Sequence, residues 1–239
     1  MTRKRSPSPS RARSRAPAPR IRAAVLDDVP ALATLYAESC AHDPSYGALF
    51  HELDAAGERD ALQWFFTRRL TLILSQIAGG AGGAILVAVD GAGAVLGGVG
   101  LLPQSLAHFS VWAAAAWAVT WLCKFGVSSL FRLLDLDKKY GAGLRPAPDE
   151  RELVMLAVRA ASRSGGVGTA LLRAALLTAP PGARLLLGTN TAANAQFYAR
   201  RGWQLSSTCE IAVRGVPRAY TQHVFRALRE EALAGAGAR

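Results

Sequence analysis

An unbroken apolar run from Leu153 to Val158 directly follows the acidic residue Glu152. A run of this length without polar alternation is typical of a strand that is buried on both faces. After a short glycine-rich turn, the stretch from Thr169 to Leu177 is dense in Ala and Leu and predicts a helix. The centre of the chain is therefore expected to be a strand, a glycine-rich turn and a helix.

The same patterns predict the other elements. Strands are expected at 21–25, 85–89, 94–102, 184–188, 203–213 and 218–225, and helices at 27–40, 58–77 and 192–201. The sequence Asp90-Gly91-Ala92-Gly93 indicates a hairpin between two of the strands. A turn is expected from His42 to Tyr46, and a charged loop rich in Gly and Pro from Asp135 to Pro148.

The glycine-rich turn, Arg163-Ser164-Gly165-Gly166-Val167-Gly168, can aim several backbone N–H groups at one ligand. The first turn of the following helix adds unpaired N–H groups and the positive end of its dipole, so the unit suits a phosphate or pyrophosphate. A P-loop is excluded because no Lys-Ser or Lys-Thr follows the glycines, and a dinucleotide fingerprint because Leu171 replaces its third glycine. A tight turn that merely requires glycine is the alternative.

Two motifs give this chain a resemblance to a known family. Arg163-x-x-Gly166-x-Gly168 resembles the acetyl-coenzyme A loop of the GNAT-type N-acetyltransferases, and Asn194-x-x-Phe197-Tyr198-x-x-x-Gly202-Trp203 resembles a second element of that family, with Trp at its end in place of Phe. The resemblance implies an α/β (α+β) fold of the acyl-CoA N-acyltransferase kind: a mixed, mostly antiparallel central sheet of six to seven strands, flanked by helices and carrying a helical insert. It further implies acetyl-CoA as co-substrate and no metal.

The resemblance also implies the residues of the site. Residues that would hold the coenzyme are Leu156, Ala157, Val158, Arg163, Ser164, Gly165, Gly166, Val167, Gly168, Thr169, Asn194 and Phe197. Tyr198 matches the family tyrosine that acts as general acid on the leaving thiolate. Glu152 lies where some protein-acetylating members carry a catalytic Glu, and a partly buried carboxylate with a raised pKa suits a general base.

Each of these two roles has a plainer alternative. Glu152 could be a solvated residue at a strand end, and Tyr198 a packed aromatic residue. Four scattered histidines are alternative bases whose ordinary role would be structural: His42, His51, His108 and His223.

The stretch from Phe109 to Leu134 is the most unusual part of the chain, nearly all apolar as far as Cys123. The apolar run from Phe109 to Cys123 is shorter than the roughly 18 to 20 uninterrupted apolar residues of a membrane span, so a buried helix or a lid is expected, with membrane contact as an alternative. The resemblance suggests that Trp112, Trp117 and Trp121 line an apolar acceptor site.

Composition changes the picture only at the N-terminus. The net charge is +11, but residues 1–20 hold six Arg and one Lys without an acidic residue, and the other 21 basic and 17 acidic residues leave +4. The body is therefore a poor candidate for a specific nucleic-acid binder. Three isolated cysteines indicate a reducing compartment and support neither a disulfide framework nor a zinc site.

The expected organisation is a disordered basic tail at 1–20, an acetyltransferase domain at 21–228 with an apolar insert at 104–148, and a flexible tail at 229–239. The expected location is the cytoplasm, with organelle targeting by the basic tail as the alternative. We expect transfer of an acetyl group to the amine of a small molecule. The alternatives are a protein Lys or N-terminal acetyltransferase, or a non-catalytic module of the same fold that binds coenzyme A or docks on a membrane.

Overall fold

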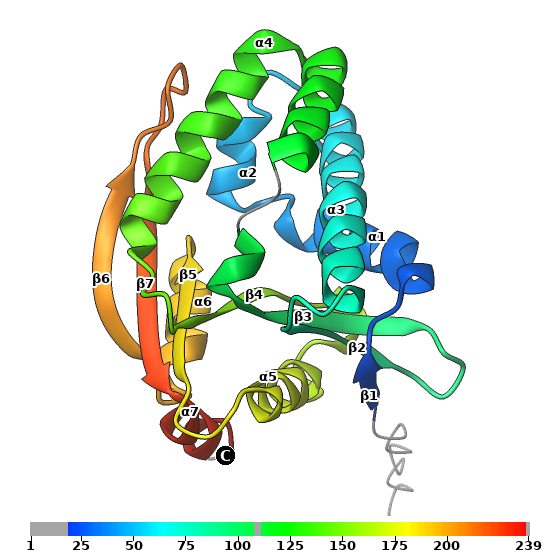
Figure 1. Ribbon diagram of the computed structural model, residues 1–239, viewed down its shortest axis with the longest axis vertical. Coiled ribbons are helices and arrows are strands. Elements are labelled where there is room, and N and C mark those ends of the chain that lie inside the picture. Colours follow the sequence, from blue (N-terminus) through cyan, green and yellow to red (C-terminus); the bar gives the residue numbers. More distant parts are fainter. Residues whose placement is uncertain (1–18, 108–110, 238–239) are drawn as a thin grey trace, which may run out of the picture.

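A computed structural model describes residues 19–107 and 111–237, apart from a few side chains between 105 and 114. Its centre is a seven-stranded sheet with the order β1-β2-β3-β4-β5-β7-β6 (Figure 1). The strands are β1 (Arg20–Ala23), β2 (Ala84–Val89), β3 (Val95–Pro103), β4 (Arg151–Val158), β5 (Arg184–Thr189), β6 (Gln204–Ile211) and β7 (Tyr220–Leu228). Only β4 and β5 pair in parallel, so the predicted mixed, mostly antiparallel sheet is confirmed.

Helices cover both faces of the sheet (Figure 1). On one face lie α1 (Val29–Cys40), α2 (Pro44–Leu49), α3 (Ala55–Ala78) and α4 (Val111–Leu144). On the other lie α5 (Val167–Thr178), α6 (Ala192–Ala199) and α7 (Arg229–Gly237), and short 3-10 turns occur at Leu26–Asp28, Gln104–Ala107 and Ala160–Ser162. Each face thus has its own apolar core.

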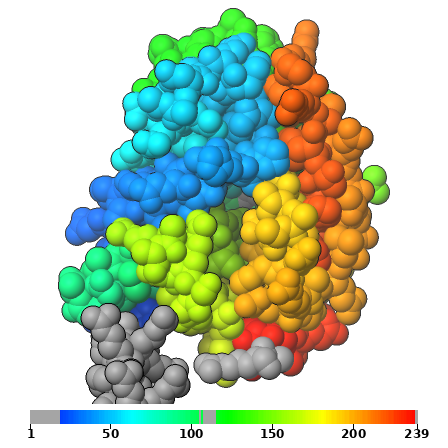
Figure 2. All heavy atoms as spheres, turned by 180° about the vertical axis from the view of Figure 1, so that it is seen from behind, coloured from blue at the N-terminus to red at the C-terminus, as the bar shows by residue number. Residues whose placement is uncertain are grey.

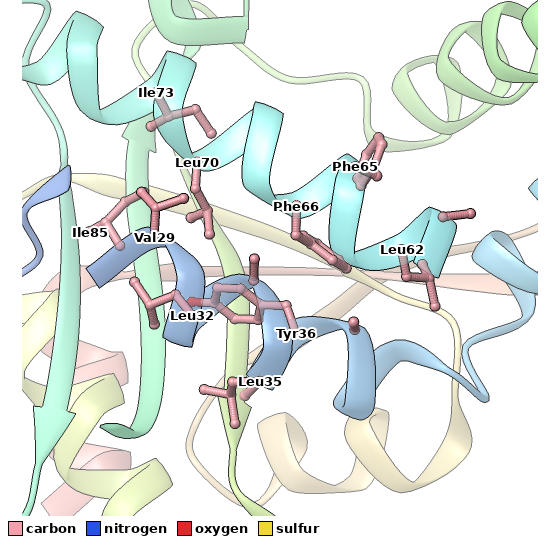
Figure 3. Close-up of a cluster of buried hydrophobic side chains, with 14 of the residues drawn as sticks. Val29, Leu32, Leu35, Tyr36, Leu62, Phe65, Phe66, Leu70, Ile73 and Ile85 are labelled. Atoms are coloured by element: carbon pink, nitrogen blue, oxygen red, sulfur yellow. The ribbon is translucent and has the colours of Figure 1, made fainter. Parts of the chain in front are cut away.

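The larger core joins α1 and α3 to the sheet. Figure 3 shows Phe66 and Leu70 of α3 above Leu32 and Tyr36 of α1. All four side chains are fully buried. Phe65 points to the other side of α3, where its ring packs against Trp117 and Trp121 of α4. Helix α3 therefore contacts two partners, α1 below and α4 above.

The predicted loop from Asp135 to Pro148 is wrong, because α4 continues to Leu144. Leu136, Tyr140 and Leu144 recur every four residues and place one apolar face against the sheet. Gly143 belongs to this contact, since a Cβ there would overlap the side chain of Gln222 on β7. Glycine at this position reflects close packing of a helix on a strand. Earlier in α4 the chain changes direction at Gly126, where φ is +78° and the helix kinks.

Two shorter helices were not predicted. The expected turn at His42 to Tyr46 is the start of α2, where the Asp43 side chain accepts a hydrogen bond from the Ser45 N–H and Pro44 occupies the first position. The expected flexible tail after Leu228 is instead α7, which buries Ala232 and Ala236 against the core that includes α5. The expected N-terminal tail lies almost wholly outside the described residues.

Candidate active site

The sheet opens between β4 and β5. These strands pair only at Arg151 with Leu185 and at Glu152 with Leu186, and the described structure shows no ladder pair between them beyond Glu152. Met155 adopts a positive φ of +54° within a bulge that shifts the register of β4 against β3. The second half of β4, with Leu156, Ala157 and Val158, thus borders an opening in the sheet.

The bulge also changes which side chains face which core. Before it, Glu152 and Val154 face the side of α1 to α4, whereas Leu153 joins the core under α5. After it, Ala157 faces α1 and α3, and Leu156 and Val158 face α5. The predicted catalytic Glu152 and the predicted coenzyme-binding Leu156 and Val158 therefore lie on opposite faces of one strand.

The glycine-rich turn connects β4 to α5 as predicted. Ser164 and Gly166 have φ of +64° and +83°, and Gly166 is the N-cap of α5. Within the described structure, the backbone N–H groups of residues 164–169 have no hydrogen-bond acceptor. Residues 163–166 are exposed. The unpaired N–H groups, the left-handed backbone at Gly166 and the N-terminus of α5 therefore lie together at the surface. This arrangement fits a diphosphate.

The surface is hollowed beside this turn. Figure 2 shows a cleft between the loop with α5 and the helix α6. Two other open hollows lie elsewhere. One, of about 420 Å³, is lined by Arg20, Arg22 and residues 89–93, and the other, of about 260 Å³, includes Glu150, Arg184 and Arg226 in its lining. Neither includes a predicted site residue, and neither has the unpaired N–H groups that mark the cleft.

The other predicted coenzyme-binding residues differ in their exposure and in their hydrogen bonds. Arg163 is exposed, and its Nε donates to the Val158 carbonyl at 3.2 Å. Thr169 accepts a hydrogen bond from Arg201, whose guanidinium carbon lies 3.7 Å from the centroid of the Phe197 ring. Asn194 is exposed, and its backbone N–H caps α6 by donating to Thr191. Arg201 thus links the first turn of α5 to α6.

Tyr198 lies on α6 and packs against Trp203 and Phe225, on the same side of the sheet as α5. Its hydroxyl has no hydrogen-bond partner in the described structure and is not fully enclosed. Burial of the ring raises the pKa of this phenol. The side chain would therefore keep its proton at neutral pH.

Glu152 belongs to a polar cluster on the opposite face, made of Asp43, Tyr46, Arg69, Tyr140 and Glu152. The Glu152 carboxylate has no hydrogen bond or ion pair in the described structure. Burial raises its pKa, the charge of Asp137 raises it further, and Arg69 opposes both. Glu152 is thus a half-buried carboxyl group without a partner in the described structure.

Two contacts close the cluster against β5. The Tyr140 hydroxyl lies so close to Gly188 that a Cβ at Gly188 would overlap it. Asn190, just past the end of β5, donates from its side-chain nitrogen to the Asp43 carboxylate at 3.1 Å, while its Oδ1 is buried without a partner. The cluster therefore borders the opening between β4 and β5.

Sequence reasoning missed most of this cluster. Tyr140 lay in the stretch predicted as a loop, and Asp43 and Tyr46 in a predicted turn. Arg69 could have been singled out from the sequence, because it is a charged residue at a core-facing position of α3 between Phe65 and Ile73.

The other predicted residues do not join the cluster. Trp121 is 0% exposed and packs among Phe50, Trp64 and Phe125, so it belongs to the core and lines no acceptor site. His223 lies in β7 opposite Thr189, His51 is 4.0 Å from the Glu52 carboxylate, and His42 is exposed. His108 and the side chain of Trp112 lie outside the described part.

The described residues contain no group of three or more His, Cys, Asp or Glu that could hold a metal ion. Of the helices in the described ranges, none has the length and apolar character that crossing a bilayer requires.

Comparison with known proteins agrees with the fold. The sequence model of the acetyltransferase (GNAT) domain matches residues 127–205. No curated protein matches the chain.

Solved structures with the same fold include a variant of agmatine N-acetyltransferase in its apo form, at 13% identity and a TM-score of 0.57, covering 88% of this chain and 99% of that one. A histone acetyltransferase HPA2 and related acetyltransferase from Corynebacterium glutamicum is 18% identical with a TM-score of 0.54, covering 87% and 95%. A phosphinothricin acetyltransferase from Sinorhizobium meliloti, in complex with acetyl-CoA, is 15% identical with a TM-score of 0.52, covering 88% of each chain.

Proposed function

We propose that this chain, whose residues 127–205 match the acetyltransferase (GNAT) domain, transfers an acetyl group from acetyl-CoA to the primary amine of a small molecule. One observation carries the proposal. Six consecutive backbone N–H groups, from Ser164 to Thr169, are unpaired beside the cleft between α5 and α6, near the strands β4 and β5 that stop pairing after Glu152. The solved relative from Sinorhizobium meliloti, in complex with acetyl-CoA, supports the choice of co-substrate.

The N–H groups of the turn would bind the pyrophosphate of coenzyme A. Gly166 and Gly168 keep side chains out of this contact, and the unpaired edge of β4 would lie along the rest of the coenzyme. Acetyl-CoA supplies an activated thioester carbonyl. The chain has to bind it, bring the amine to it and move two protons.

We assign the proton from the amine to Glu152. Its raised pKa suits a general base near neutral pH, and its carboxylate has no partner in the described structure to compete with a substrate. The amine nitrogen then bonds to the carbonyl carbon, the carbon–sulfur bond breaks, and the thiolate takes a proton from Tyr198. The products are an acetylated amine and coenzyme A.

The position of α4 supports a small acceptor over a protein segment. Tyr140 on α4 reaches β5 at Gly188, so this helix covers the face of the sheet on which Glu152 lies. The acceptor would approach beneath a helix, and an extended peptide would have to displace it.

The test is release of free coenzyme A thiol from acetyl-CoA with a panel of amines, together with mass spectrometry of the acetylated product. Because Cys123 is exposed and Cys40 and Cys209 are also free thiols, a blank without acceptor sets the baseline of the thiol reagent. Acceptor-dependent release that is lost in Glu152→Gln would support the proposal. Failure to bind coenzyme A by calorimetry would refute it.

A further inference from the structure

Arg69 is a cation without a partner on the core-facing side of α3. Its neighbours along that side are the buried Phe65, Leu70 and Ile73. Its guanidinium makes no hydrogen bond and no ion pair in the described structure, and its Nε is fully enclosed. The side chain is half-buried, and a partly desolvated charge costs free energy unless something pairs with it.

The guanidinium faces the polar cluster. Arg69 follows Phe65 by one helical turn and lies over its ring, with 5.9 Å between the guanidinium carbon and the ring centroid. Phe65 points away from α1 and toward α4 (Figure 3). Arg69 also interacts electrostatically with Glu152 and with Tyr46.

Arg69 and Glu152 do not pair with each other, since no ion pair within 4.0 Å joins them. One half-buried cation and one half-buried carboxyl group thus border the same region, and neither has an ion-pair partner in the described structure. An acceptor that carries both an amine and a carboxylate supplies both missing partners at once. A plain amine would leave Arg69 unpaired, and a second cation on the acceptor would be repelled by it.

Resting on the proposed acetyl transfer, we propose that the acceptor is an α-amino acid whose carboxylate is bound by Arg69 and whose amine faces Glu152. The forked N–H groups of arginine match a carboxylate in a bidentate contact. The neighbouring walls favour an apolar side chain, because the rings of Tyr46 and Phe65 pack against each other and Phe65 packs against Trp117.

The test compares amino acids with the amines that lack only the carboxylate: L-phenylalanine with phenylethylamine, L-leucine with isoamylamine, and L-tryptophan with tryptamine. We expect kcat/KM of the wild-type chain to favour at least one amino acid over its matched amine by about 30-fold or more. In Arg69→Met that preference should disappear through a higher KM for the amino acid. Arg68→Met is the matched control, because the exposed Arg68 lies over Trp64 instead.

Rates are compared at the plateau of each variant's pH profile, since loss of Arg69 raises the pKa of Glu152. Arg69→Lys, which keeps the charge and loses the fork, should restore part of the preference. Equal rates for amino acid and amine in the wild type would overturn the inference. An equal loss on both substrates in Arg69→Met would also overturn it, because Arg69 would then serve the thioester or Glu152.

Calorimetry separates this inference from the proposed function. L-phenylalanine, L-leucine and L-tryptophan are titrated into the chain with coenzyme A present, for the wild type and for both arginine variants. Binding that Arg69→Met abolishes and Arg68→Met retains would support the amino-acid site even if no acetyl transfer occurred. Acetylation of plain amines alone, without amino-acid binding, would leave the transferase in place and refute the inference.

Discussion

The Tyr140 hydroxyl lies directly against Gly188, at a point of β5 where any side chain would collide with it. Gly188 is two residues beyond Leu186, the last residue of β5 that pairs with β4. A helix residue predicted to be in a loop and a strand glycine therefore meet at the edge of the opening in the sheet.

Gly188→Ala should push the Tyr140 side chain away from β5 and disturb the acceptor side of the site. We expect kcat/KM for the best acceptor to fall about tenfold or more, because displacements of about 1 Å in an active site are costly. The dissociation constant of coenzyme A, measured by calorimetry, should stay within about twofold. Tyr140→Phe combined with Gly188→Ala should recover only part of the activity, because a Cβ at Gly188 also lies 2.9 Å from Leu144.

Glu152→Gln should lower kcat by about 10² to 10⁴-fold and remove the acidic limb of the pH profile. In the wild type the rate should rise with pH through the raised pKa of Glu152, since the base must lose its proton. Steady-state rates across pH measure both effects. An acidic limb that persists in Glu152→Gln would assign it to another group.

The same carboxyl group should affect stability with the opposite trend. Because its folded-state pKa is raised, its contribution to the free energy of unfolding is fully present below the unfolded pKa of about 4.3 and is lost as pH rises through the folded value. The Tm of Glu152→Gln should therefore exceed that of the wild type increasingly over this window. Thermal melts at a series of pH values check the sign, and a constant difference between the two proteins would contradict it.

Gly166→Ala places a side chain at a φ of +83° within the predicted pyrophosphate turn. The strain should cost about 1 kcal/mol of stability, and the distorted N–H groups should raise the dissociation constant of coenzyme A about tenfold or more. Gly182→Ala is the control, because Gly182 has a φ of +75° in a loop before β5, away from the turn. Both variants should lose similar stability, and only Gly166→Ala should lose affinity for coenzyme A.

Tyr198→Phe retains the ring that packs against Trp203 and Phe225 and removes only the hydroxyl. We expect kcat to fall by about 10² to 10⁴-fold while coenzyme A binding and Tm change little. A normal turnover in this variant would leave Tyr198 as a packing residue.

The sequence predicted best where local chemistry decides the structure. The strand before Arg159, a left-handed glycine at Gly166 and the helix after it follow from backbone preferences, and all three are present. It failed where tertiary contacts override those preferences. Gly141 and Gly143 are typical of a loop, yet α4 continues through both, and at Gly143 close packing on Gln222 of β7 leaves no room for a side chain. Arg69 and Tyr140 could not be grouped with Glu152 in advance, since only the fold brings α3, α4 and β4 together.

β4 and β5 stop pairing after Glu152, and the glycine-rich turn lies on one side of the sheet there and the polar cluster on the other. Under the proposed function the donor and the acceptor approach from opposite sides, so neither has to leave before the other arrives. Direct transfer within one ternary complex then needs no acetylated enzyme, and initial-rate plots against the two substrates should show intersecting lines.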